Sequence, residues 1–286
     1  MPTVGNILIF ETETGKMQKL VDNHDKYEVL RQEMCTFQEY KPDELAWKMF
    51  SEDLYYRLSW NSNALEGNTI SLEETVSLLE YDEVRSGHTF TEYQEAKSMY
   101  ATIKRFLTLA NSRYFDEADL KEMNAMIRGR ETSDYRNGNN YVGTLLEVTY
   151  VPPDYTCVPE KMKKLLADMR DEKGGTIEEQ IQNICEQHIL FERIHPFWDG
   201  NGRTGRLLMS QQLANSGALP AIILDQGKYR QAFRRYDRNK DISLMENVVL
   251  NGILESYKNL SVARKKVQHR KRGRLIMPSV GNIGKG

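Results

Sequence analysis

The chain has 286 residues, of which 40% are hydrophobic and 28% are charged. This length and composition allow a full hydrophobic core and exclude a disordered or collagen-like chain. No apolar run approaches the roughly 18 residues of a membrane-spanning helix, and the N-terminus lacks the basic and apolar pattern of a signal peptide. Three widely spaced cysteines without a CxxC pair suit a reducing compartment. We therefore expect a globular, cytoplasmic protein with no membrane contact.

The formal charge of −2 conceals an asymmetry along the chain. Residues 264–286 carry eight Lys and Arg and no acid, which leaves a net charge of −10 on the rest. Such a tail could contact the phosphates of a nucleic acid. We expect a solvated basic tail instead, because glycines are frequent near its end, and we keep nucleic-acid binding as an alternative.

Helical periodicity dominates the sequence in chain order. A first amphipathic stretch covers about residues 45–68 and ends at a glycine, a common residue at helix C-termini. Three capping boxes, each a Ser or Thr followed three residues later by Glu or Gln, predict helix starts: Ser71 with Glu74, Thr91 with Gln94, and Ser243 with Glu246. Further helices are predicted over residues 117–127, 159–170, 177–191, 204–215, 229–236 and 244–265.

Strand signals are few. Residues 141–151 are rich in Val, Thr and Tyr and end at a Pro pair, which predicts a hairpin or an extended loop. Residues 221–224 are a second candidate strand. On the helix before His195, Cys185 and His188 share a face with isoleucines, so we expect a buried thiol and a hydrogen-bonded core imidazole. The fold class is therefore mainly α, with one small β element.

One segment carries the chemistry: residues 195–206 read HPFWDGNGRTGR. Glycines let backbone N–H groups approach anionic oxygens, a helix N-terminus adds positive potential, and arginines bind phosphate with two donors. An acid at this position could hold Mg²⁺ together with substrate phosphates. His195 could accept a proton from a hydroxyl, since imidazole titrates near neutral pH; alone it could equally be a packed loop histidine. The segment predicts a polyphosphate site.

The same segment also imitates a dinucleotide-binding fingerprint. Gly200, Gly202 and Gly205 satisfy GxGxxG, and Asp225 follows twenty residues after the last glycine. That fingerprint requires a buried strand before the first glycine. The preceding pattern is helical, so a dinucleotide-binding oxidoreductase is only a remote alternative.

The segment resembles the signature of the Fic family, HPFxDGNGRxxR, at every fixed position. The flank agrees, because His188, Phe191 and Ile194 match the family pattern HxxFxxIHPF. The resemblance implies a helical Fic fold with a small β-hairpin flap, and transfer of AMP from ATP to a Tyr, Ser or Thr hydroxyl of a target protein or of the enzyme itself. It divides the chain into an N-terminal region (1–112), a Fic core (113–263) and the basic tail (264–286).

Residue roles follow from this resemblance. His195 would deprotonate the hydroxyl, and Asp199 would hold Mg²⁺. The ATP phosphates would be bound by Gly200, Asn201, Gly202, Arg203 and Arg206. Trp198 occupies a variable position and receives no role. Phosphotransferase relatives replace the second glycine by lysine and lack the last arginine, so Gly202 and Arg206 favour nucleotide transfer.

Residues 62–67 read SNALEG and are similar to the family's inhibitory motif, [ST]xxxE[GN]. Ser62 and Glu66 lie one turn apart on a helix, and the resemblance implies that Glu66 pairs with Arg206 and obstructs the γ-phosphate. The expected result is low basal activity in a class II Fic protein. A glutamate here could alternatively position water for de-AMPylation.

The substrates are less well specified. The flap, about residues 141–158, would hold the target segment in extended form by main-chain pairing. Tyr229 and Phe233 match the family's adenine-flanking residues in spacing, with Asp237 as a weaker candidate; helix packing explains them equally well. Self-association is common among Fic proteins, so a homo-oligomer is possible. A catalytically idle regulator that binds a nucleotide or nucleic acid remains the alternative of another class.

Overall fold

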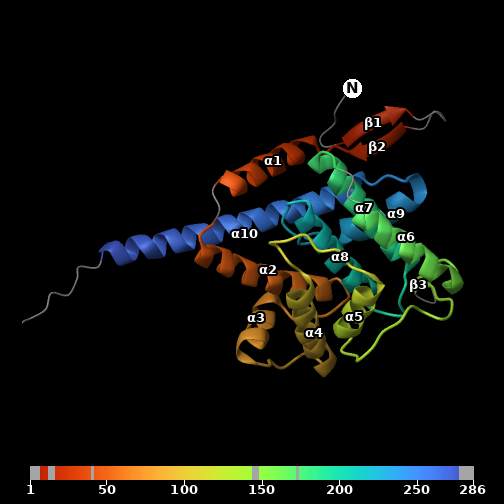
Figure 1. Ribbon diagram of the computed structural model, residues 1–286, viewed down its shortest axis with the longest axis horizontal. Helices are drawn as coiled ribbons and strands as arrows, with labels where there is room; N and C mark the ends of the chain where they lie inside the picture. Colours follow the sequence, from red (N-terminus) through yellow and green to blue (C-terminus); the bar gives the residue numbers. More distant parts are fainter. Residues whose placement is uncertain (1–6, 12–16, 40–41, 144–147, 172–173, 277–286) are drawn as a thin grey trace, which may run out of the picture.

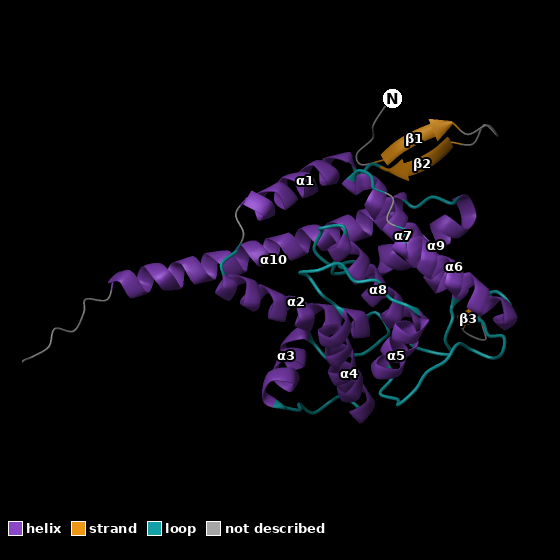
Figure 2. Cartoon of the chain, in the orientation of Figure 1, coloured by secondary structure: helices purple, strands orange, loops and turns teal. Residues whose placement is uncertain are grey.

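The computed structural model in Figure 1 describes residues 7–11, 17–39, 42–143, 148–171 and 174–276. Helices make up most of it, which confirms the mainly α class (Figure 2). The α-helices are α1 (His24–Glu39), α2 (Glu44–Ala64), α3 (Leu72–Tyr81), α4 (Phe90–Phe106), α5 (Glu117–Ile127), α6 (Val158–Arg170), α7 (Ile177–Ile194), α8 (Asn201–Asn215), α9 (Gln226–Asn239) and α10 (Ser243–Ile276). None of the described helices is long and apolar enough to cross a membrane.

The capping prediction holds for one of the three boxes. Ser71 and Glu74 cap α3 reciprocally, as expected. For α4 the box is Thr89 with Glu92, so the predicted Thr91–Gln94 pair is wrong by two residues. At the start of α10 the Ser243 hydroxyl accepts a hydrogen bond from the backbone N–H of Val21 instead of capping its own helix. Tertiary contacts took the place of the local cap there.

The predicted hairpin is present and the predicted strand at 221–224 is not. β3 (Val142–Gly143) pairs antiparallel with β4 (Val148–Tyr150). Residues 221–224 instead have no regular secondary structure and pack on α10, where Gly252 lies so close to the Ile222 backbone that any Cβ would clash. The Asn61 side chain of α2 satisfies both the N–H and the C=O of Ile223, at 2.9 and 2.8 Å. With these groups satisfied, no neighbouring strand is required.

The N-terminal segment forms elements that the sequence did not reveal. β1 (Ile7–Glu11) pairs antiparallel with β2 (Met17–Val21), and α1 follows and packs along α10 (Figure 1). Its anchors are polar: Asn23 donates to the Ser243 carbonyl, and the Tyr27 hydroxyl donates to Glu246 at 2.7 Å.

The core is continuous across the predicted boundary between residues 112 and 113. One apolar cluster contains Phe50 of α2, Phe106 of α4 and Phe191 of α7. Cys185 and His188 are buried, and His188 Nε2 lies 2.7 Å from the Tyr229 hydroxyl, as the prediction of a hydrogen-bonded core imidazole requires. The N-terminal region is therefore packed into the same body as the predicted Fic core.

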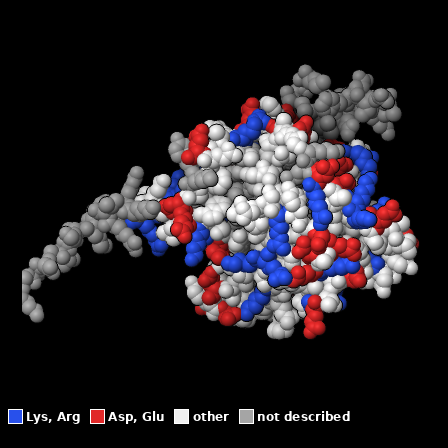
Figure 3. Space-filling model, in the orientation of Figure 1, with Lys and Arg blue, Asp and Glu red and all other residues white. Residues whose placement is uncertain are grey.

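α10 is the longest helix, about 50 Å at 1.5 Å per residue, and its end projects from the body (Figure 1). The predicted solvated tail is thus helical as far as Ile276; residues 277–286 lie outside the described part. On the face shown in Figure 3, basic and acidic side chains are interspersed.

Candidate active site

The signature forms the connection between α7 and α8. α7 ends because His195 adopts a left-handed conformation with φ 50° and is followed by proline, which cannot continue a helix. Gly200 precedes α8 with φ +78°, a value that favours glycine. A helix, not a strand, therefore precedes Gly200, and the dinucleotide alternative is excluded. The turn points the N–H groups of the first turn of α8 toward the site, where an anion can bind.

His195 is held by backbone contacts. Burial lowers its pKa, and this effect outweighs a ring N–H bond to the Glu192 carbonyl, which raises it. The imidazole is therefore neutral near pH 7, with one ring nitrogen available to take a proton. Arg136, which is buried, donates from Nε to the His195 carbonyl at 2.9 Å and from Nη1 to the Gly138 carbonyl at 3.0 Å. Sequence reasoning missed Arg136, whose role depends on contacts 59 residues away.

Asn201 closes the loop. Its side-chain oxygen accepts from the Phe197 N–H at 2.9 Å, and its Nδ2 donates to the Phe197 carbonyl at 2.8 Å. The oxygen and the nitrogen of the Asn201 amide therefore both bond to the backbone of Phe197. The structure places the Asn201 side chain as a support of the loop, and its backbone N–H belongs to the first turn of α8.

Asp199 lies at the rim of the loop, with its side chain 59% exposed. One carboxylate oxygen accepts from the Gly200 N–H at 2.6 Å, and the other lies 3.2 Å from Arg128 Nε. No cluster of three His, Cys, Asp or Glu that could hold a metal occurs among the described residues. A single accessible carboxylate nevertheless fits Mg²⁺, which is commonly held by one or two carboxylates and substrate phosphates. The metal would have to replace Arg128.

The two signature arginines are each paired with a carboxylate from the N-terminal region. Arg203 Nη1 donates to Glu95 of α4 at 2.9 Å, and Glu95 also accepts from Asn68 at 3.0 Å. Glu95 was not predicted, because only the fold brings α4 to this position. Its contact with Asn68 links Arg203 to the turn that follows Glu66.

The predicted partnership between Glu66 and Arg206 is present in the structure. Arg206 Nη2 donates to Glu66 at 2.6 Å and to the Ser62 carbonyl at 2.9 Å, while Nε donates to the Ser62 hydroxyl at 3.0 Å. Burial raises the pKa of Glu66, but the charges of Arg206 and Arg203 lower it by more than burial raises it. The pKa of Glu66 therefore lies below its usual value. A Cβ on Gly202 would overlap the Glu66 carboxylate. An ionised carboxylate therefore lies against the N-terminal turn of α8.

Glu192, on the last turn of α7, is a second carboxyl group near Arg206. Burial raises the pKa of Glu192 to about 7. The charge of Arg206 acts to lower this pKa, and the charge of Glu66 acts to raise it. Its Oε1 is buried without a hydrogen-bond partner and presses against Gly205, where a Cβ would clash. The sequence offered no signal for this role, because Glu192 sits in an ordinary helical pattern.

The adenine candidates lie together but in different surroundings. Tyr229 is buried, and its hydroxyl contacts His188. Phe233 meets the Tyr229 ring edge to face at 5.1 Å. Asp237 accepts hydrogen bonds from Nε and Nη2 of Arg193, at 2.9 and 2.7 Å. The Arg193 guanidinium also lies over the rings of Tyr150 and Phe233. Arg193 therefore fastens the flap strand β4 to α9.

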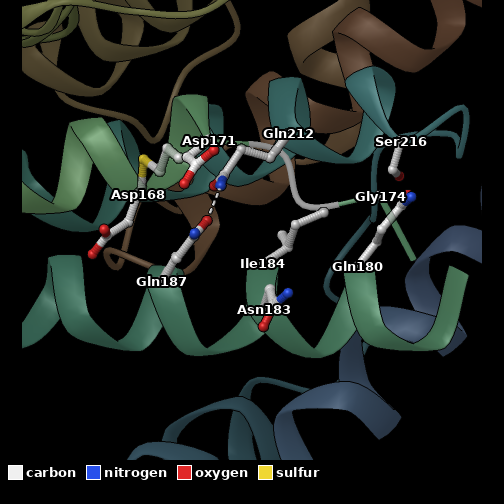
Figure 4. Close-up of a pocket in the computed structure, with 10 residues that line it drawn as sticks. Asp168, Asp171, Gly174, Gln180, Asn183, Ile184, Gln187, Gln212 and Ser216 are labelled. Atoms are coloured by element: carbon white, nitrogen blue, oxygen red, sulfur yellow. Dashed lines mark hydrogen bonds between the residues drawn. The ribbon is translucent and has the colours of Figure 1, made fainter. Parts of the chain in front are cut away.

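A separate cavity of about 140 Å³ lies at the opposite end of α7 and α8 (Figure 4). The side chains of Gln187 and Gln212 form a hydrogen bond across it. Gln212 is eleven residues after the start of α8, or about 16 Å along the helix. This cavity is distinct from the connection between α7 and α8 that carries the signature.

Comparison with known proteins agrees with this geometry. Residues 114–213 match the Fic/DOC family. Residues 114–213 are therefore similar to a Fic domain. It is 32% identical to protein adenylyltransferase fic-1 of Caenorhabditis elegans over 185 residues, which are 62% of this chain and 35% of the relative. It is 28% identical to protein adenylyltransferase Fic of Aedes aegypti over 238 residues, 80% of this chain and 46% of the relative. The chain thus spans less than half the length of these two relatives.

Solved structures support the Fic fold. Fic-1 of C. elegans (residues 134–508) aligns with a TM-score of 0.68 at 24% identity, covering 84% of this chain and 72% of that one. A Fic domain-containing signaling protein of Bacteroides thetaiotaomicron aligns with a TM-score of 0.68 at 24% identity, covering 85% and 97%. At this identity the likeness shows the fold alone.

Proposed function

We propose that this chain is an autoinhibited protein adenylyltransferase that transfers AMP from ATP to a Tyr, Ser or Thr hydroxyl of a target protein. The observation that carries the proposal is the placement of Asp199, Arg203 and Arg206 at the start of α8, directly after the turn that begins at His195. Relatives named protein adenylyltransferase support the reaction class. Three free cysteines fit a cytoplasmic location, which we also propose.

Each residue of the candidate site has its own role in the proposed reaction. His195, neutral near pH 7, takes the proton of the attacking hydroxyl. The N–H groups of the first turn of α8, with Arg203 and Arg206, bind phosphate oxygens and stabilise charge in the transition state. Asp199 would hold Mg²⁺, which supplies positive charge at the phosphates when bound. The β3–β4 flap would align the target segment, with Arg193 fixing its position.

We propose that Glu66 is the inhibitory residue. Its carboxylate is paired with Arg206 against the start of α8, where an ATP phosphate would otherwise bind. ATP must therefore displace a short charge-assisted hydrogen bond to bind productively. Each 1.4 kcal/mol of bias toward the Glu66 contact lowers the competent population about tenfold.

The test is labelling of the purified protein with ATP carrying a labelled α-phosphate. Glu66→Gly should raise auto-modification at least about tenfold. The double variant Glu66→Gly/His195→Ala should transfer no label. Mass spectrometry of lysate proteins treated with Glu66→Gly should then find adenylyl groups that are missing after treatment with the double variant. Unchanged labelling in Glu66→Gly would contradict the inhibitory role of Glu66. Salt-sensitive nucleic-acid binding without labelling would favour a catalytically idle regulator.

A further inference from the structure

A cavity of about 310 Å³ adjoins the connection between α7 and α8 on the side of α4 and α5. Its described lining comes from the first half of α4, the C-terminal end of α5 and the start of α8. Asp199 and Arg203 belong to this lining, whereas Glu66, His195 and Arg206 are not among the described lining residues. The cavity therefore touches the proposed active site without overlapping the inhibitory contact.

Positive charge exceeds negative charge around this cavity. The basic lining residues are Lys97, Arg128, Arg130 and Arg203. Its acids, Glu95 and Asp199, are already paired with Arg203 and Arg128. Lys97 pairs with Asp82 on the exposed surface, and such pairs contribute little in water. A net positive cavity beside phosphate-binding residues attracts anions.

A second observation concerns Arg203, a nearly buried cation that borders the cavity. The Arg203 side chain is 7% exposed, and its Nε is buried without a hydrogen-bond partner in the described part of the chain. A buried cation with unused hydrogen-bonding capacity is stabilised by a nearby anion. The first turn of α4 also borders the cavity at Thr91, which adds the positive end of that helix.

We propose that this cavity receives the pyrophosphate released in the proposed reaction, on which this inference rests. The target hydroxyl oxygen forms a bond to the α-phosphorus, and its proton goes to His195. The bond from the α-phosphorus to the oxygen that bridges to the β-phosphate breaks, and pyrophosphate leaves with that electron pair. Arg203 borders both the α8 turn and the cavity, so it can pass the diphosphate toward Arg128 and Arg130.

Calorimetric titration of the full chain with inorganic pyrophosphate, without ATP, tests this site directly. Arg130→Ala and Lys97→Ala should each weaken binding about threefold to tenfold by removing a lining charge. Arg105→Ala is the matched control, because this arginine lies at the far end of α4, paired with Glu122. Inorganic phosphate should bind at least about tenfold more weakly than pyrophosphate, since it makes fewer ionic contacts.

Other results would overturn the proposal. If Glu66→Gly tightens pyrophosphate binding while Arg130→Ala leaves it unchanged, the ligand binds at Arg206 and not in the cavity. Equal affinity for phosphate and pyrophosphate would contradict a diphosphate site. The assay requires no turnover, so Arg130-dependent binding in the natural chain, together with no labelling by Glu66→Gly, would contradict the adenylyltransferase proposal while supporting the diphosphate site.

Discussion

At the scale of single residues, the candidate site is organised by carboxylates that neutralise cations. Glu66 holds Arg206, Glu95 holds Arg203, and Asp199 holds Arg128. Each of these arginines is thereby kept in place without a phosphate ligand. Occupying the site with ATP then exchanges carboxylate partners for phosphate oxygens, which limits the net gain in binding free energy.

Glu192 gives a prediction about stability and pH. Its folded-state pKa is about 7, raised above the ordinary value of 4.5 by burial. A raised pKa contributes stability that is fully present below pH 4.5 and is lost as the pH rises through 7. The difference corresponds to about 3 kcal/mol. Glu192→Gln, which cannot ionise, should therefore gain thermal stability relative to the natural protein as the pH rises from 5 to 8.

Melting temperatures at several pH values check this prediction. Glu160→Gln, an exposed change on α6, is the control and should follow the natural protein at every pH. A constant difference between Glu192→Gln and the natural protein from pH 5 to 8 would show that Glu192 does not titrate as expected.

At the scale of elements, the turn after the inhibitory motif is fastened to the start of α4. The Thr69 N–H and hydroxyl both donate to Glu92, at 2.8 and 2.6 Å, and Asn68 donates to Glu95. Glu92 at the same time caps α4 through Thr89. The position of Glu66 therefore depends on α4 as well as on its own helix.

Thr69→Val should loosen this turn, because it removes the hydroxyl contacts with Glu92 and with His88 Nδ1 and keeps the backbone bond to Glu92. Each exposed hydrogen bond contributes about 0.5–1.5 kcal/mol, so basal auto-modification should rise at least about twofold, but less than with Glu66→Gly. The label-transfer assay measures the change. Thr36→Val is a suitable control, since that hydroxyl donates only within α1; equal labelling by both variants would refute the role of the turn.

At the scale of the whole molecule, the N-terminal segment is anchored to α10 through buried polar groups. Burial and Glu246 raise the pKa of Tyr27, so its hydroxyl remains a donor to that carboxylate. Asn247 donates to Asn23 at 2.8 Å, and Asn23 donates to the Ser243 carbonyl. These bonds replace the capping box that the sequence predicted at Ser243.

Tyr27→Phe should destabilise the fold, because it leaves the buried Glu246 carboxylate without this donor. The expected loss is about 1–3 kcal/mol in the free energy of unfolding, measured by urea denaturation. Tyr81→Phe, at a side chain 72% exposed, is the matched control and should change little. An equal loss in the free energy of unfolding for both variants would contradict a specific contribution of the contact between Tyr27 and Glu246.

The features with local signals were predictable from the amino-acid sequence alone. The helical pattern, the Ser71 capping box and the resemblance of residues 195–206 to the Fic signature depend on residues close together in the chain, and so does the spacing of Ser62 and Glu66. The roles of Glu95, Arg136 and Glu192, and the irregular structure of residues 221–224, became visible only in the folded chain. Each of these depends on partners far away in sequence or on burial, and neither is visible before the helices pack.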